Sequence, residues 1–139
     1  MKDIVITLPE RLWYLICTGR KKLELRKSIP VEFDLDFSRC WVVLKGTSYV
    51  AGYFYLDSFR EDYEYIQQID VIAKAAAVSV QFVRSYYQGS EKACIWNIGP
   101  VCQFSRLYDR FYLFGMKHNP QSFVYVDGPM HNLYVQRVQ

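Results

Sequence analysis

Charged side chains that could bind an anion or move a proton are concentrated in one short segment, Gly19 to Lys27, with the sequence GRKKLELRK. An arginine guanidinium offers a planar fork of N–H donors that suits a phosphate group or the edge of a base. A carboxylate beside it, here Glu24, can orient that fork or accept a hydrogen bond from an amino group. This segment, which we call the charged run, predicts one basic site for an anion or an amino-bearing base. Its basic residues are Arg20, Lys21, Lys22, Arg26 and Lys27.

The charged run has the period of a β-strand with one apolar and one charged face, because Leu23 and Leu25 alternate with charged residues. The alternation places Lys22, Glu24 and Arg26 on one side of that strand. The alternative is that this side is the solvated surface of an edge strand, where charges block aggregation. The charges alone leave both interpretations open.

The elements that must hold the charged run are indicated by the sequence on either side of it. Asp3 to Leu8 is a β-branched run that predicts a strand, and Pro9 suits the first turn of a helix that Gly19 ends. Gly52 predicts a bulge or the close approach of another backbone. Further strands are predicted at Cys40 to Leu44, Tyr49 to Leu56, Ala93 to Ile98, Val101 to Leu107, Phe111 to Phe114, Ser122 to Val126 and Leu133 to Val138.

Helical periodicity interrupts these strands between Asp62 and Gly89. Apolar residues recur at helical spacing from Asp62 to Ala77, and Ser79 can cap a second helix that Gly89 ends. We interpret the pair as a helical insertion at about 62–89 in a single domain that spans 1–139. Many strands around a few helices indicate an α+β fold whose sheet curls into a barrel to remove its edges.

Composition agrees with one globular domain, since 51% of the 139 residues are hydrophobic and 17% aromatic. The net charge of +3 does not by itself identify a nucleic-acid binder. No apolar stretch approaches the roughly 20 residues of a membrane span. Asp3, Glu10 and Arg11 stand where a signal peptide needs an apolar core, so we expect a cytoplasmic protein without a membrane partner.

Neither a metal nor a cofactor is expected from the cysteine and histidine spacing. His118 and His131 have no third ligand at a recognised interval. The cysteines match neither a zinc pair nor a disulfide framework, and we expect them to be reduced and packed as small hydrophobic residues. They are Cys17, Cys40, Cys94 and Cys102.

Three segments resemble one known family. The spacing Gly19-x-Lys21-x-x-Glu24-x-Arg26 resembles the Gly-x-Lys-x-x-Glu-x-Arg signature of the ASCH family, which belongs to the PUA-like superfamily. Residues 82–99 are similar to a pattern in one uncharacterised branch of that family, and residues 120–125 resemble the Pro-Gln-Ser-Phe-x-Tyr ending of that branch. The resemblance covers about residues 4 to 126 in the family's order, and it implies a PUA-like β-barrel with a cleft beside the signature strand.

The family also implies a relationship to RNA-binding modules and, in some members, hydrolysis of acetylated cytidine or of RNA. In the amidohydrolase members, a lysine equivalent to Lys21 works with a threonine three positions later. Glu24 stands at that position here, so the hydroxyl is missing and the carboxylate favours a protonated lysine. Binding is therefore a better interpretation than catalysis.

The charged run and the family resemblance together suggest three possible functions. The first is an RNA- or nucleotide-binding domain whose basic cleft recognises a modified base or regulates RNA or transcription. The alternative is a hydrolase, either an acetylcytidine-type amidohydrolase or a ribonuclease, with Lys21 and Glu24 as the acid/base pair. The third is a regulatory domain that reads a modified base or a small nucleotide as a signal, without catalysis, while the helical insertion faces a protein partner.

The binding hypothesis gives each residue a role. Lysine and arginine contact phosphates, Glu24 orients Arg26 or reads an amino group, and Gln121 and Ser122 offer an amide to a base edge and a hydroxyl to a phosphate. Gln121 and Ser122 also fit a plain turn with local hydrogen bonds. The candidate ligand-binding residues are Lys21, Lys22, Glu24, Arg26, Lys27, Gln121 and Ser122. The candidates for stacking on a base are Tyr86, Tyr87, Trp96 and Trp13.

Overall fold

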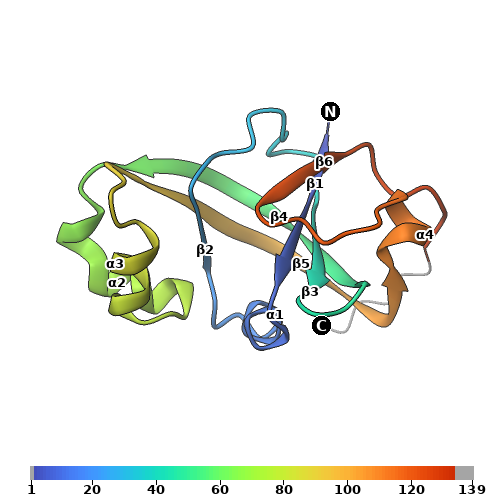
Figure 1. Ribbon diagram of the computed structural model, residues 1–139, viewed down its shortest axis with the longest axis horizontal. Coiled ribbons are helices and arrows are strands. Elements are labelled where there is room, and N and C mark those ends of the chain that lie inside the picture. Colours follow the sequence, from blue (N-terminus) through green and yellow to red (C-terminus); the bar gives the residue numbers. More distant parts are fainter. Residues whose placement is uncertain (1, 134–139) are drawn as a thin grey trace.

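Within residues 2–133, which the computed structural model describes, six strands form one mixed sheet in the order β2-β5-β4-β3-β1-β6 (Figure 1). The strands are β1 (Asp3–Leu8), β2 (Leu23–Arg26), β3 (Cys40–Leu44), β4 (Tyr49–Asp62), β5 (Ala93–Asp109) and β6 (Phe123–Val126). The helices are α1 (Glu10–Cys17), the 3₁₀ helix η1 (Tyr65–Gln68), α2 (Ile69–Ala76), α3 (Val80–Tyr86) and α4 (Arg110–Phe114).

The sheet is antiparallel except where β1 runs parallel to β3. Strands β2 and β6 are its two edges, yet Arg26 Nη1 on β2 donates to the carbonyl oxygen of Ser122, the residue before β6, at 3.1 Å. A single side chain therefore spans the distance between the edges, because the sheet curls into a half-barrel. The α+β prediction with a curled sheet is confirmed.

The helices that the sequence placed between 62 and 89 cover one end of the sheet (Figure 1). Strand β4 extends through Asp62 before they begin, and Ala77 ends α2 with a left-handed φ of 59°. Ser79 caps α3 as predicted, since its side chain accepts from the N–H of Phe82 at 3.0 Å. Ile72 and Val83 are buried against the apolar side chains of β2 and β5. That these helices are an insertion stays a prediction.

No single helix in the described part of the chain is long and apolar enough to cross a membrane. The bent pair Tyr65–Ala76 and Val80–Tyr86 passes the same test of length and composition when its two members are taken together.

Two strand predictions were wrong. The segments 93–98 and 101–107 are one strand, β5, because shifts in its register with β4 carry the pairing past Gly99 and Pro100. Residues 111–114 lie in α4, whose start is capped by Asp109 accepting from the N–H of Phe111 at 2.8 Å. Such a short apolar run has no period that separates helix from strand. The predicted strand at 133–138 lies, apart from Leu133, outside the described residues.

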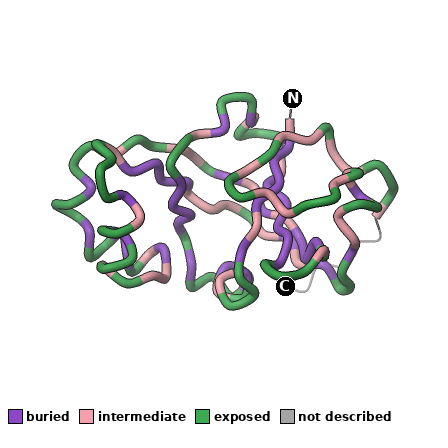
Figure 2. The backbone as a smooth tube through the Cα atoms, in the orientation of Figure 1, coloured by how far each residue is buried: buried purple, intermediate pink, exposed green. Residues whose placement is uncertain are grey.

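Buried residues follow the strands through the middle of the molecule (Figure 2). The predicted close approach at Gly52 is confirmed, since a Cβ there would lie 2.3 Å from the carbonyl oxygen of Cys102 and 2.7 Å from the ring of Trp13. All four cysteines are buried, as expected of small hydrophobic residues. Burial raises the pKa of the Cys17 thiol to about 11.

Candidate functional site

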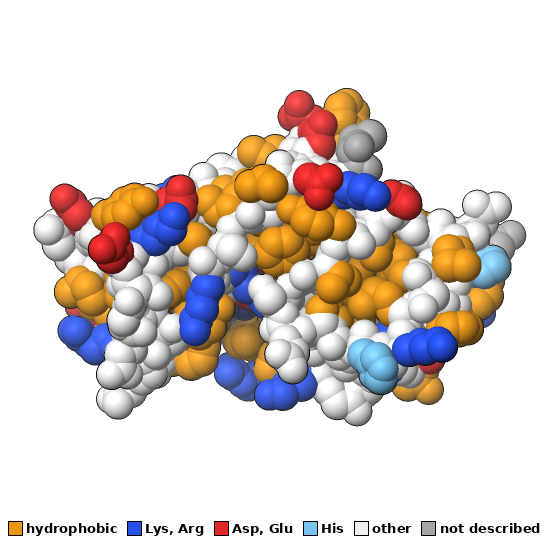
Figure 3. Space-filling view, turned by 45° about the horizontal axis from the view of Figure 1, so that its top comes forward, with side chains coloured by type: hydrophobic (Ala, Val, Ile, Leu, Met, Phe, Trp, Pro, Cys, Tyr) orange, Lys and Arg blue, Asp and Glu red, His pale blue; other side chains and the backbone are white. Residues whose placement is uncertain are grey.

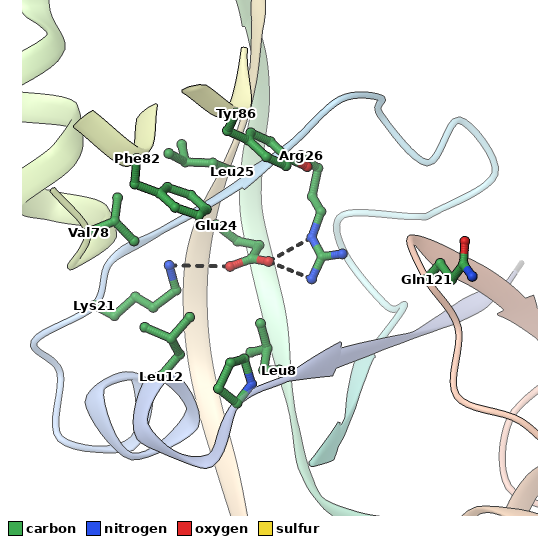
Figure 4. A pocket seen from close by; sticks show the side chains of 11 residues that line it. Leu8, Leu12, Lys21, Glu24, Leu25, Arg26, Val78, Phe82, Tyr86 and Gln121 are labelled. Carbon is green, nitrogen blue, oxygen red and sulfur yellow. Dashed lines mark hydrogen bonds and ion pairs between the residues drawn. The ribbon is translucent and has the colours of Figure 1, made fainter. Parts of the chain in front are cut away.

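Three side chains of the charged run form a buried ion cluster (Figure 4). Glu24 lies at its centre, with Oε1 3.3 Å from Lys21 Nζ and Oε2 2.6 Å from both Nε and Nη2 of Arg26. The three residues are 3%, 4% and 7% exposed, in the order Lys21, Glu24 and Arg26. The alternative of a solvated edge-strand surface is therefore wrong for this cluster.

The local sequence explains how the side chains of the cluster are positioned. Gly19, at a φ of 77°, lets the chain turn out of α1, and the N–H of Lys21 still bonds to the carbonyl of Leu15 in that helix. The alternation in β2 then points Leu23 and Leu25 into the core shared with α2 and α3. Its charged residues point to the opposite side, as predicted, but that side is buried.

Lys21 joins two structural elements, β2 and α2, through its ammonium group. Nζ donates to the carbonyl oxygens of Leu23 at 2.7 Å and Ala76 at 2.8 Å, in addition to its contact with Glu24. Ala76 is the last residue of α2, where the helix dipole favours a cation. Burial lowers the pKa of Lys21, and the charge of Glu24 opposes that shift. A neutral amine would turn a lone pair toward one of three oxygens, so these contacts hold the ammonium form.

Arg26 retains donor capacity. Its bonds within residues 2–133 engage three of its five N–H groups, two on Glu24 and one on the carbonyl of Ser122. Its guanidinium carbon also lies 5.7 Å from the centre of the Trp96 ring. A bound molecule can therefore use the remaining N–H groups without breaking the cluster.

The ion cluster is the floor of an open cavity of about 250 Å³, which we call the base cavity. On one wall, the rings of Phe82 and Tyr86 stack with an interplanar angle of 10° and centres 5.7 Å apart (Figure 4). Lys27 Nζ lies 5.0 Å from the centre of the Tyr86 ring. Lysine and arginine side chains gather around a recess beside the helical end of the molecule (Figure 3). The other residues that line the base cavity are Leu8, Pro9, Leu12, Leu25, Val78 and Gln121.

Solved structures of an ASCH protein from Zymomonas mobilis share this architecture. The unsubstituted protein matches with a TM-score of 0.75 at 24% identity, covering 90% of this chain and 87% of that one. Two single-substitution variants match with a TM-score of 0.76, also at 24% identity, covering 90% and 91% of this chain and 88% and 91% of theirs. This chain has the ASCH fold. No protein-family profile matches the sequence, and no curated protein sequence is detectably similar to it.

The ASCH fold brings together only some of the predicted site residues. Lys21, Glu24, Arg26 and Gln121 all line the base cavity, the last from the far side of the floor (Figure 4). Lys22, predicted on the same face, does not line the base cavity: it is exposed and borders a neighbouring hollow with Asp57 and Asn97, which shares Lys21 with the base cavity. Lys27 is exposed and meets Tyr86 at the aromatic wall. Ser122 contacts Arg26 through its carbonyl oxygen, and its side chain is exposed.

Three of the predicted stacking residues are instead core residues of the ASCH fold. Tyr87 and Trp96 are fully buried, and Trp13 is 4% exposed. The Tyr87 hydroxyl lies within hydrogen-bond distance of the carbonyls of Arg26 and Cys94, so it holds β2 beside β5. Of the four candidates only Tyr86 lines the base cavity.

The apolar wall that α1 and the helical pair contribute was not predicted from the sequence. Phe82 is 47% exposed, one turn before Tyr86 on α3, and helical spacing of two aromatic residues was the available signal. Leu12 and Val78 carried no signal of their own, because only the tertiary fold brings α1 beside the α2–α3 turn. In the described part of the chain, no three His, Cys, Asp or Glu side chains are placed to hold a metal ion.

Proposed function

We propose that this protein binds RNA or a nucleotide by taking a base into the base cavity. The observation that carries the proposal is the pairing of unused Arg26 donors on the floor with the stacked rings of Phe82 and Tyr86 on the wall. Single-stranded RNA is recognised by stacking unpaired bases on aromatic rings and bonding their edges. Drug-sized ligands occupy roughly 300–1,000 Å³, so a cavity of about 250 Å³ suits a single base.

Each cavity residue has a role in this proposal. Arg26 donates to acceptor atoms on the base edge or to a phosphate, Glu24 fixes the plane of the guanidinium, and Gln121 offers an amide from the opposite side. The cluster holds two cations and one anion, so it attracts an anionic ligand. Lys27, beside Tyr86, adds to that attraction. Lys22 takes no part, because it borders another hollow.

The contacts of Lys21 do not favour the hydrolase alternative. A general base or nucleophile needs a free lone pair, and all three hydrogens of the Lys21 ammonium have an oxygen acceptor. Lys21 instead fastens β2 to the end of α2. A protein partner for the helical pair stays a prediction, while three residues from this region already serve the cavity: Val78, Phe82 and Tyr86.

Replacing Phe82 with Ala tests the binding proposal, because a ring that is 47% exposed can be removed at little cost in stability. We expect the affinity for a nucleotide to fall about tenfold, since stacking of one base contributes about 1–3 kcal/mol. Calorimetric titration of the four 5′-mononucleotides and a short single-stranded RNA would measure the loss.

Phe111→Ala is the matched control, because Phe111 is 56% exposed on α4, outside the base cavity. It should bind as the unsubstituted protein does. The proposal is wrong if no nucleotide or RNA binds at all, or if Phe82→Ala and Phe111→Ala bind equally well.

A further inference from the structure

A second hollow of about 570 Å³ lies against the base cavity, and the function proposed above does not use it. It is bounded by the start of α1 and by the turn that joins α2 to α3. The two hollows share four lining residues, so they form one continuous groove, with Phe82 where its two parts meet. The shared residues are Pro9, Leu12, Val78 and Phe82, and the second hollow adds Arg11, Ala77 and Ser79.

The second hollow combines an apolar surface with one cation. Arg11 is exposed on its wall, and its positive charge helps to lower the pKa of Lys21 on the floor of the base cavity. Glu10, also exposed, precedes Arg11 at the start of α1 and is the acidic residue next to it in the chain. Apolar walls suit the face of a base, and an exposed arginine beside them suits a phosphate.

Phe82 gives the two hollows a common stacking surface. Its ring packs against Tyr86 on the side of the base cavity, yet 47% of the residue stays exposed. Grooves that bind single-stranded nucleic acid combine aromatic platforms for successive bases with cations along the backbone. A mononucleotide in the base cavity would leave the larger part of this groove empty.

Resting on the proposed function, we infer that the ligand is a single-stranded oligonucleotide, a dinucleotide or longer, rather than a free nucleotide. One base occupies the base cavity over Arg26. The neighbouring base lies against Leu12 and Val78 in the second hollow, on the other side of Phe82. The phosphate that links the two units is paired with Arg11.

The test compares a 5′-phosphorylated dinucleotide with the corresponding 5′-mononucleotide by calorimetric titration at two salt concentrations. We expect the dinucleotide to bind the unsubstituted protein about tenfold more tightly. Its affinity should also fall more steeply with salt. The slope of log affinity against log salt concentration should be steeper by about 0.7, because one more phosphate is contacted. Arg11→Gln should lose most of the tenfold gain, while its affinity for the mononucleotide changes by less than about twofold. Arg60→Gln, which removes an exposed arginine on β4 outside both hollows, is the charge control and should keep the gain.

The outcomes separate this inference from the function on which it rests. If the mononucleotide binds and the dinucleotide binds no more tightly, the second hollow is not a nucleotide subsite, and the base cavity keeps its proposed role. An equal loss for both ligands in Arg11→Gln would likewise overturn the inference, because Arg11 would then act only through its long-range charge. If neither ligand binds, both the proposed function and the inference are wrong.

Discussion

Replacing Glu24 with Gln is expected to lower the free energy of unfolding by about 3–5 kcal/mol, because it leaves two buried cations without their anion. The glutamine side chain has nearly the same shape, so the loss reports charge rather than packing. Lys21 and Arg26 would repel each other across the site, and the attachments they make to Ala76 and Ser122 would weaken. Urea denaturation followed by circular dichroism measures the change.

Lys22→Gln is the matched control for Glu24→Gln, since Lys22 precedes the same strand and is exposed. It should alter the unfolding free energy by less than about 0.5 kcal/mol. If the free energy of unfolding of Glu24→Gln is within 1 kcal/mol of that of the unsubstituted protein, the cluster does not hold the fold together. A loss of activity or binding in Glu24→Gln would not identify a catalytic acid, because the same change disturbs the whole floor of the base cavity.

Gly52→Ala is expected to destabilise the protein by about 3 kcal/mol, at the upper end of the usual cost of overpacking a core. The added methyl group would lie 2.3 Å from the Cys102 carbonyl oxygen on β5 and 2.7 Å from the Trp13 ring on α1. Backbone on one side and a buried ring on the other leave little room to relax. Because Trp13 anchors the helix that carries Leu12, the strain would also reach the wall of the base cavity.

Gly46→Ala provides the comparison for Gly52→Ala. Gly46 has a φ of 80° and no atom within 4 Å of a Cβ, so an alanine there meets backbone strain alone, of about 1 kcal/mol. In thermal denaturation, the melting temperature of Gly52→Ala should lie well below that of Gly46→Ala. Equal melting temperatures would contradict the close contact at Gly52.

Much of the fold could be predicted because its signals are local. The β-branched residues of β1, Pro9 before α1 and the capping side chain of Ser79 act on the chain around them, and the structure confirms each of these elements. Where the deciding contact was distant, local signals failed. Gly99 and Pro100 suggested the end of a strand, yet pairing with β4 carries β5 past them. The run at 111–114 was mispredicted for a local reason: it is too short to show a period, and the Asp109 cap next to it starts a helix.

The sequence by itself placed Glu24 and Arg26 on one face of β2, because the alternation along a strand is a property of the backbone. It also predicted Lys22 on that face, but Lys21 and not Lys22 completes the ion cluster. The sequence also located the glycine that turns the chain before that strand. Only the tertiary structure decided that this face is buried: the carbonyl of Ala76 and the approach of β6 surround Lys21 and Arg26, more than 50 residues from them in sequence. The same folding exposes Lys22 and adds Phe82 to the site, because burial and the walls of a cavity depend on which distant elements meet.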